Sequence, residues 1–283
     1  MIPQTGKLYI NDSDAWKRYK VWLTDGQLAK LIQYPKLKTP EATEWAELYY
    51  TEYDLTTLLL DTRTVNLEFG IYGDRDRYDT LGSRLETYPT TLQVPLLDNA
   101  TWKLRFTGFT NPAFYYSGTS GATSLCTVTA QFSEDNPVTP TDTVGSTKLC
   151  ADSALDISGV DISYYGARLE GDTWQEALNP YAVREGLKVT TCDKQGVALY
   201  HPAGNRLKST TIKIPLVISG CTAAEAFRRY RMIINTLLDP SKTRRIVYHG
   251  MNYNCFYLSN SVDEFLTSYP AVLKVTLTMQ LSK

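Results

Sequence analysis

The sequence predicts a mainly β protein of the α+β class, made of two tandem antiparallel β-sandwich or barrel domains with one flanking helix each. Three observations lead to this prediction. Segments of the chain recur at a spacing of 147 to 149 residues, alternating strand patterns outnumber helical ones, and a polar segment separates the two halves. A repeat of this length is too long for a solenoid unit and suits a whole domain.

The repeat consists of three short matches in one register. Their offsets are 147, 147 and 149 residues, so only small insertions separate the two copies. In chain order the matches are residues 8–12 (LYIND) with 155–159 (LDISG), 64–73 (TVNLEFGIYG) with 211–220 (TIKIPLVISG), and 127–133 (TVTAQFS) with 276–282 (TLTMQLS), and Asp14 falls on Asp161.

Length and composition suit two modest domains. A chain of 283 residues is near the size at which single cores divide, and 43% hydrophobic residues supply a core for each half. A charged fraction of 21% with 20 tyrosines favours sheet surfaces over long solvated helices. Residues 133–154, rich in Pro, Thr, Ser and Asp, predict a linker with a short edge strand at 147–150. We therefore expect a first domain at 1–133, a linker at 134–154 and a second domain at 155–283.

A helix is predicted over residues 222–238 of the second half. Thr222 and Glu225 have capping-box spacing, and Asp239-Pro240 ends the run. Helical spacing predicts a face buried against the sheet and a basic face at the surface. The buried face comprises Phe227, Tyr230, Ile233, Ile234 and Leu237, and the surface face Arg228, Arg229 and Arg231.

The equivalent helix of the first half is predicted over residues 74–87. Tyr78, Leu81 and Leu85 lie on one face, and the run ends at Tyr88-Pro89. Gly82 lowers the intrinsic stability of this helix by about 1 kcal/mol relative to alanine, so the helix must depend on packing.

Strands are predicted where apolar residues alternate with polar ones. Pro215, inside one of them, must direct its nitrogen toward an edge or a bulge, because proline donates no hydrogen bond. The expected inward positions are Val65, Leu67, Phe69 and Ile71; Ile212, Ile214, Leu216 and Ile218; Val128, Ala130 and Phe132; and Leu277, Met279 and Leu281. Further strands are expected at 102–106, 245–248 and 254–258.

The chain contains little that predicts catalysis, and we expect no enzyme and no catalytic, cofactor-binding or metal-binding residues. No metalloprotease, nucleophile-elbow, P-loop or dinucleotide-binding motif occurs. The two histidines, His201 and His249, lie in polar turns, and nothing orients His249 against Cys255 as a nucleophile pair. The five cysteines are odd in number and never spaced as CxxC, which favours buried thiols in a reducing compartment.

Clusters of acidic, basic and aromatic residues have ordinary structural explanations. The glutamate cluster is explained by a solvated turn or strand rim. The aspartate cluster is explained by the first turns of a helix, where the helix dipole favours negative charge. The basic cluster suits the solvated side of a helix, a protein contact or phosphate, and the aromatic clusters suit interfaces or a sugar-binding platform. These clusters are Glu41, Glu44 and Glu47; Asp74, Asp76 and Asp79; Arg228, Arg229, Arg231, Lys242, Arg244 and Arg245; and Tyr49, Tyr50 and Tyr53, Phe114, Tyr115 and Tyr116, and Tyr164 and Tyr165.

Charge gives no support for binding to nucleic acid or to a membrane. The net charge is −1, and no segment approaches 18 apolar residues. The halves differ, with 13 Lys and Arg against 17 Asp and Glu in residues 1–135, and 16 against 13 in residues 136–283. This difference is compatible with unlike halves meeting in an assembly and with ordinary scatter of surface charge.

In its order of elements the first half resembles the N-terminal domain of phage distal tail proteins, within the wider tail-tube superfamily. The resemblance rests on residues 8–26 (LYINDSDAWKRYKVWLTDG), 34–47 (YPKLKTPEATEWAE) and 61–73 (DTRTVNLEFGIYG), followed directly by a helix. The second half repeats the order with 155–171 (LDISGVDISYYGARLEG), 211–220 and its helix. The resemblance covers nearly the whole chain, but only at the level of pattern.

The resemblance implies a structural protein of the virion tail, made in the cytoplasm of a bacterial host. In the family this unit is a β-sandwich with a flanking helix, six copies of which close a ring around the tail channel. The implied partners are copies of the chain itself, as a trimer with pseudo-sixfold symmetry or as a hexamer, and neighbouring tail tube and baseplate proteins. DNA passing through the ring would not be read by sequence.

This chain departs from distal tail proteins in its second half. Those proteins usually follow the ring domain with a galectin-like or oligonucleotide-binding fold, whereas here the second half resembles another ring domain. Tandem tube-like domains also occur in baseplate hub proteins, which are longer and carry domains that this chain lacks. The alternative function is a duplicated carbohydrate-binding or adhesin module that uses tyrosine and tryptophan platforms.

Overall fold

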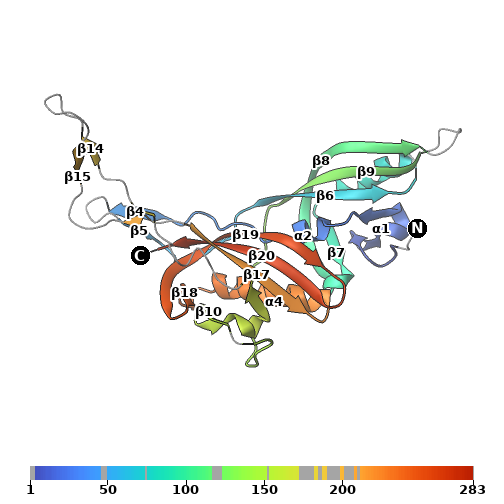
Figure 1. Ribbon diagram of the computed structural model, residues 1–283. Coiled ribbons are helices and arrows are strands. Elements are labelled where there is room, and N and C mark those ends of the chain that lie inside the picture. Colours follow the sequence, from blue (N-terminus) through green and yellow to red (C-terminus); the bar gives the residue numbers. More distant parts are fainter. Residues whose placement is uncertain are drawn as a thin grey trace.

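The predicted fold class is confirmed by the computed structural model, which is mainly β with two seven-stranded antiparallel sheets and helices beside each (Figure 1). One of the sheets forms a half-barrel. The structure describes residues 4–45, 50–73, 75–116, 123–151, 153–171, 182–183, 187–189, 198–200, 207–208 and 211–282.

The first sheet has the strand order β2-β1-β7-β8-β9-β6-β3. Its longest strands, β8 and β9, lie side by side at the upper right of Figure 1. The strands are β1 (Tyr9–Ile10), β2 (Ser13–Asp14), β3 (Val21–Leu23), β6 (Arg63–Ile71), β7 (Thr90–Val94), β8 (Ala100–Tyr116) and β9 (Thr123–Glu134).

The second sheet has the strand order β11-β10-β18-β19-β20-β17-β12. Replacing each strand by its counterpart in chain order reproduces the order of the first sheet, so the two halves have the same topology, as the sequence repeat predicts. The strands are β10 (Leu155–Ile157), β11 (Val160–Asp161), β12 (Ala167–Leu169), β17 (Thr211–Gly220), β18 (Arg245–Tyr248), β19 (Met251–Leu266) and β20 (Ala271–Leu281).

Within the described residues, three further two-stranded pairs lie outside the large sheets. β4 pairs with β5, β13 with β16, and β14 with β15. The β4–β5 and β14–β15 hairpins lie at the same end of the molecule, at the left in Figure 1. Their bounds are β4 (Ala42–Trp45), β5 (Tyr50–Tyr53), β13 (Ala182–Val183), β14 (Leu187–Val189), β15 (Ala198–Tyr200) and β16 (Leu207–Lys208).

The strand registers correct one of the three sequence matches. Thr64 pairs with Ser133 in the first sheet, and Thr211 pairs with Gln280 in the second. With Thr64 equated to Thr211, β9 and β20 correspond at an offset of 147 residues and not 149. The sequence match is therefore wrong by two residues, but two residues are one full period of a strand, so the inward positions stay inward. All the predicted inward side chains are buried.

Both halves also begin in the same way. Asp14 and Asp161 each accept two backbone hydrogen bonds, one from the following turn and one from the chain entering the half. In the first half the donors are Lys17 N at 2.9 Å and Gly6 N at 2.8 Å. In the second half Ser163 N and Ser153 N lie at 2.7 and 3.3 Å. Each aspartate thus caps a short helix and holds the segment of chain that leads into its half.

Replacing either aspartate with alanine should therefore lower the free energy of unfolding by similar amounts. We expect about 0.5–2 kcal/mol for Asp14→Ala and for Asp161→Ala, because each change removes a helix cap. Urea unfolding followed by circular dichroism measures both. Lys17→Ala, at an exposed position in the short helix that Asp14 caps, is the matched control and should change stability little. Aspartate variants as stable as this control would contradict equivalent roles.

The two long helices confirm the predicted equivalence. α3 (Arg75–Leu85) and α4 (Ala223–Leu238) each follow the long strand beside the edge strand of their sheet, β6 or β17. In α3, Leu81 and Leu85 are buried and Tyr78 packs on Phe109 at a ring distance of 4.9 Å. A Cβ at Gly82 would lie 3.2 Å from the Phe109 ring, so this glycine allows the close approach.

The first half also contains two short helices that were not predicted, α1 (Ala15–Tyr19) and α2 (Gln27–Ile32). The remaining helical turns are η1 (Pro95–Leu97) and η2 (Ile162–Tyr165).

The predicted linker begins at Glu134, the last residue of β9; its described residues 135–151, 153 and 154 form no strand, and several of them contact the second half. The edge strand predicted at 147–150 is absent, because Leu149 makes a single backbone hydrogen bond, from its N–H to Ser163 O at 2.9 Å, instead of a ladder. Asp142 O accepts from Asn235 Nδ2 of α4 at 2.9 Å, and the Asp142 carboxylate pairs with Arg231 at 2.7 Å. The division into domains at 1–133 and 155–283 stays a prediction.

Pro215 occupies the position that was expected for it. Its carbonyl accepts from Glu170 N, on the side of β12, so its nitrogen faces the same side. β12 has its last ladder pair at Leu169 and Leu216. The proline therefore lies at the end of the β12–β17 ladder, where its missing N–H interrupts no pair of that ladder.

Candidate assembly surfaces

Cys255 and His249 lie in different surroundings. Cys255 is buried, and burial raises the pKa of its thiol to about 12, so it is a neutral thiol and not a thiolate at physiological pH. His249 is exposed in the β18–β19 turn, with its ring 4.4 Å from that of Tyr248. His201 lies outside the described residues. The nucleophile pair that the sequence left open therefore has no geometric support.

The acidic clusters do not form a metal site among the described residues, where no group of three or more potential ligands occurs. Glu41, Asp76 and Asp79 are exposed. The side chains of Glu44, Glu47 and Asp74 lie outside the described set.

Arg229 is not at the surface, and this prediction is wrong. Arg229 is 8% exposed; its guanidinium donates to Ser219 O and pairs with the Glu225 carboxylate, which neutralises a charge that burial alone would disfavour. A Cβ at Gly166 would lie 2.4 Å from Arg229 Nη1, so a glycine there makes room for the guanidinium. Arg228 is exposed as predicted, whereas Arg231 is half-buried, its guanidinium carbon 5.7 Å from the centre of the Phe227 ring.

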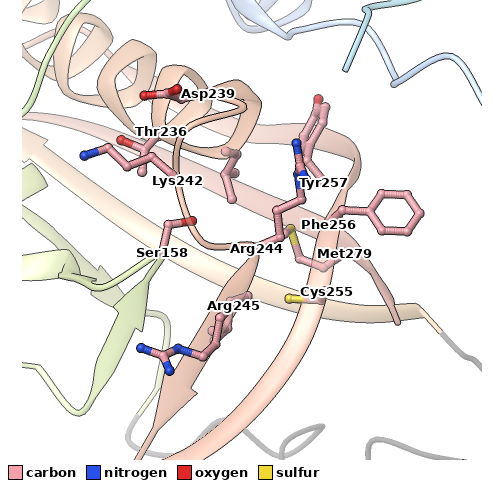
Figure 2. A pocket seen from close by; sticks show the side chains of 12 residues that line it. Ser158, Thr236, Asp239, Lys242, Arg244, Arg245, Cys255, Phe256, Tyr257 and Met279 are labelled. Atoms are coloured by element: carbon pink, nitrogen blue, oxygen red, sulfur yellow. The ribbon is translucent and has the colours of Figure 1, made fainter. Parts of the chain in front are cut away.

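The other basic residues do not form a phosphate site. Figure 2 shows Lys242, Arg244 and Arg245 around a cavity of about 10 Å³ near the end of α4, lined also by Asp239 and Cys255. This volume holds about one water molecule and is too small for a phosphate group. The predicted basic residues are therefore divided among different places. Arg229 forms an internal ion pair, Arg231 contacts the linker, and the three basic residues named above line this small cavity.

The aromatic clusters form no shared platform in the part of the chain that is described. Tyr165 is fully buried, with its hydroxyl 3.0 Å from Thr236 Oγ1. Tyr53 packs on Phe256 of the second half at 5.0 Å, and Phe114 packs on Tyr78 at 5.8 Å. Tyr115 is exposed. Tyr164 is half-buried beneath Lys148 at 5.6 Å, and the side chains of Tyr49, Tyr50 and Tyr116 lie outside the described set.

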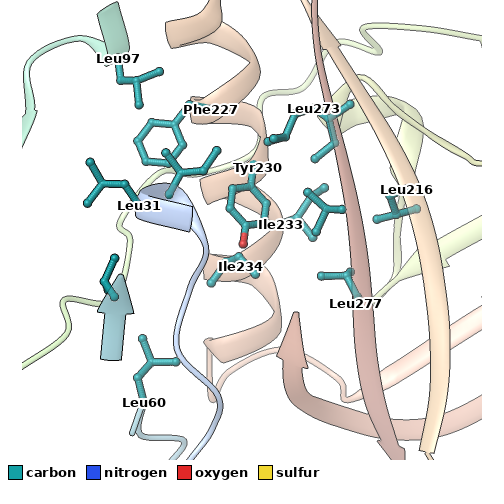
Figure 3. Close-up of a cluster of buried hydrophobic side chains, with 14 of the residues drawn as sticks. Leu31, Leu60, Leu97, Leu216, Phe227, Tyr230, Ile233, Ile234, Leu273 and Leu277 are labelled. Carbon is teal, nitrogen blue, oxygen red and sulfur yellow. The ribbon is translucent and has the colours of Figure 1, made fainter. Parts of the chain in front are cut away.

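The principal contact surface inside the chain joins the two halves, and α4 lies in it. Eleven of its 16 residues are buried, because it is covered on two sides. Figure 3 shows Ile233 directed at Leu216, Leu273 and Leu277 of its own sheet. Phe227 lies instead beside Leu31 and Leu97 of the first half, and its ring is 6.1 Å from that of Trp102. The prediction that the whole apolar face packs on its own sheet is therefore wrong for Phe227, although all five predicted side chains are buried.

A buried polar network connects β19 and α4 of the second half to the segment after α2 of the first half. Asn260 of β19 is 6% exposed. Its Oδ1 accepts from the Tyr230 hydroxyl at 2.7 Å, and its Nδ2 donates to Tyr34 O at 3.2 Å and to the Tyr257 hydroxyl at 2.5 Å. Tyr257 in turn donates to Pro35 O at 2.9 Å. Burial raises the pKa of Tyr34, Tyr230 and Tyr257 above the usual value, so the network stays uncharged at neutral pH.

Backbone and ionic contacts fix the same segment. Leu37 N donates to Leu258 O at 2.8 Å, so a residue of the first half bonds to a strand of the second. Arg63 pairs with Glu134 at 2.5 Å and donates to Leu31 O at 2.9 Å, which also satisfies a carbonyl at the end of α2. Sequence reasoning missed this surface, because Asn260 lies beyond the predicted strand 254–258 and its partner in the first half, Tyr34, is 226 residues away in the chain.

The edges of the two sheets are candidate surfaces for contacts with other molecules. Each sheet ends in strands of two or three residues: β2 and β3 in the first, β11 and β12 in the second. Short edge strands limit uncontrolled pairing while leaving N–H and C=O groups available to a specific partner.

Neither the models of known protein families nor the curated protein sequences match this chain. Among the described helices, none is both long enough and apolar enough to cross a membrane.

Proposed function

We propose that the chain is a structural component of a phage or prophage tail, a distal tail or baseplate hub ring protein that acts by assembly and not by catalysis. The observation that carries the proposal is the identical strand order of the two sheets, together with the packing of both halves into one hydrophobic core. Two units of one fold in a single chain suit an assembly in which that fold is required at two positions. The resemblance to tail-tube domains supplies the particular role.

The tandem favours a trimer with pseudo-sixfold symmetry over a hexamer. Each sheet has two unlike edges, and contact between unlike edges is heterologous, so it closes into a ring when the rotation between units allows. Two units in each chain would let three chains supply six positions around the axis. The partners in this proposal are other copies of the chain and the adjoining tail tube and baseplate proteins, with DNA passing through the ring.

The test is whether the chain is present in tail particles. We expect mass spectrometry of purified tails to detect it, and gold-labelled antibody to bind at the junction of tube and baseplate. Isolated protein can be monomeric without contradicting the proposal, because weak ring contacts depend on concentration and on neighbours. Absence from tails, together with specific glycan binding by the purified chain, would support the adhesin alternative instead.

A further inference from the structure

A cavity of about 370 Å³ lies where the two halves of the chain and the linker meet. Tyr34 and Trp102 of the first half and Phe227 of α4 line it with aromatic side chains, and residues 136–140 of the linker form a further wall that contains two prolines. Small-molecule sites have volumes of this order and often lie between domains. The cavity is therefore large enough for a small ligand with a flat apolar body.

Arg231 of α4 brings unused hydrogen-bond donors to this cavity. Its Nε pairs with the Asp142 carboxylate at 2.7 Å, and its side chain remains 32% exposed. Neither of its Nη groups donates a hydrogen bond to a described residue. The Phe227 ring lies 5.7 Å from the guanidinium carbon and supports the guanidinium from one side. A guanidinium held in this way is preorganised to donate to both oxygens of a carboxylate.

Two further donors line the same cavity. The backbone N–H and carbonyl of Tyr34 are both hydrogen-bonded, but its hydroxyl bonds to no described residue. Burial raises the pKa of Tyr34, so the hydroxyl keeps its proton at neutral pH and can donate it to a hydrogen bond. Lys103 of β8 is exposed and forms no ion pair with a described residue. Three side chains from three different segments thus offer donors to one cavity.

The charge of the lining favours an anionic ligand. Arg63 and Glu134 also line the cavity, but they pair with each other at 2.5 Å, and the other Arg63 donors bond to backbone carbonyls. Arg231 and Lys103 are the remaining charged groups among the described residues of the lining, and both are cations. Asp142 offsets part of the Arg231 charge but is not itself part of the lining. A carboxylate in the cavity would balance the remaining positive charge.

We propose that this cavity is a binding site for a small carboxylate with a flat apolar body. The carboxylate accepts hydrogen bonds from Arg231 and Tyr34 and is attracted by Lys103, and the apolar body lies against Trp102 and the linker. Because the ligand contacts both halves and the linker, its binding stabilises their packing against each other. The inference goes beyond the proposed role in assembly and does not depend on it.

The test uses the full chain with indole-3-acetate as the probe and indole-3-acetamide as its uncharged counterpart of nearly the same shape. We expect saturable binding of indole-3-acetate in isothermal titration calorimetry. The acetamide should bind about tenfold more weakly or less, because it cannot form the charge-assisted bidentate bond to Arg231. Equal affinity for the two compounds, or no saturable binding of indole-3-acetate up to about 5 mM, would overturn the proposal.

Two variants of one ion pair separate ligand binding from structural support. Arg231→Gln and Asp142→Asn both break the pair between α4 and the linker, but only Arg231→Gln removes the guanidinium. We expect Arg231→Gln to weaken indole-3-acetate binding about tenfold or more, and Asp142→Asn to leave it equal or tighter. Equal loss in both variants would overturn the proposal, because the pair would then act only by holding the linker in place.

A third variant tests the site without disturbing any bond of the folded chain. Tyr34→Phe removes a hydroxyl that has no hydrogen-bond partner among the described residues, so the fold should be retained. Binding of indole-3-acetate should weaken about threefold or more, as expected for the loss of one hydrogen bond. Unchanged binding in Tyr34→Phe would contradict the proposed site, and this result can be read even if Arg231→Gln does not fold.

Discussion

Phe227→Ala should lower the free energy of unfolding by about 3–5 kcal/mol, because it removes a large side chain that is 4% exposed from the surface between the halves. The cavity would open toward Trp102 and Leu97 of the first half as well as within the second. The loss of unfolding free energy should therefore be seen in the unfolding of both halves. Urea unfolding followed by tryptophan fluorescence reports mainly on the first half, which contains four of the five tryptophans.

Arg228→Ala is the matched control for Phe227→Ala. Arg228 is exposed on the same helix, one residue away, and its removal should change stability by no more than about 0.5 kcal/mol. Equal effects of the two changes would mean that the buried face of α4 is wrongly assigned. A fluorescence transition unaffected by Phe227→Ala would mean that the halves unfold separately.

Asn260→Ala should cost about 2–4 kcal/mol. The change leaves the Tyr230 hydroxyl without its acceptor and Tyr34 O without its donor, both at a buried surface, and each unsatisfied group costs roughly 1–3 kcal/mol. Tyr257 keeps its bond to Pro35 O, which limits the loss. Chemical denaturation measures the difference in unfolding free energy.

The control for Asn260→Ala is Asn252→Ala, on the same strand but exposed. Because no buried group depends on the Asn252 side chain in the structure, this change should be nearly neutral. An Asn260→Ala protein as stable as the Asn252→Ala protein would show that the network does not hold the halves together.

The sequence was sufficient for features that depend on local pattern. The apolar period of two in β6 and β17 predicted every inward residue of these strands, and the capping box at Thr222 marked the start of α4, where Thr222 Oγ1 accepts from Glu225 N. The repeat predicted equal topology, because two copies of one pattern in one order fold in one way.

Features that depend on distant contacts could not be predicted. Arg229 follows a surface arginine, and only the fold brings Ser219 O and Glu225 to its guanidinium. The helical pattern predicts which face of α4 is buried, but not that the first half packs against this helix as well as its own sheet. The contact of Phe227 with Trp102 was therefore missed. β19 was predicted at 254–258 but runs over Met251–Leu266, because two bulges shift its register and break the alternation that marks a strand.

The central claim is that two like units in one chain build a ring in a phage tail. The most direct measurement is cryo-electron density of tails from the phage or prophage that encodes the chain, with the chain fitted and its copies counted around the tail axis. We predict three chains that place six similar β units around the channel at the junction of tube and baseplate. A tail map with every ring at this junction assigned to other proteins, and no density for this chain, would contradict the claim.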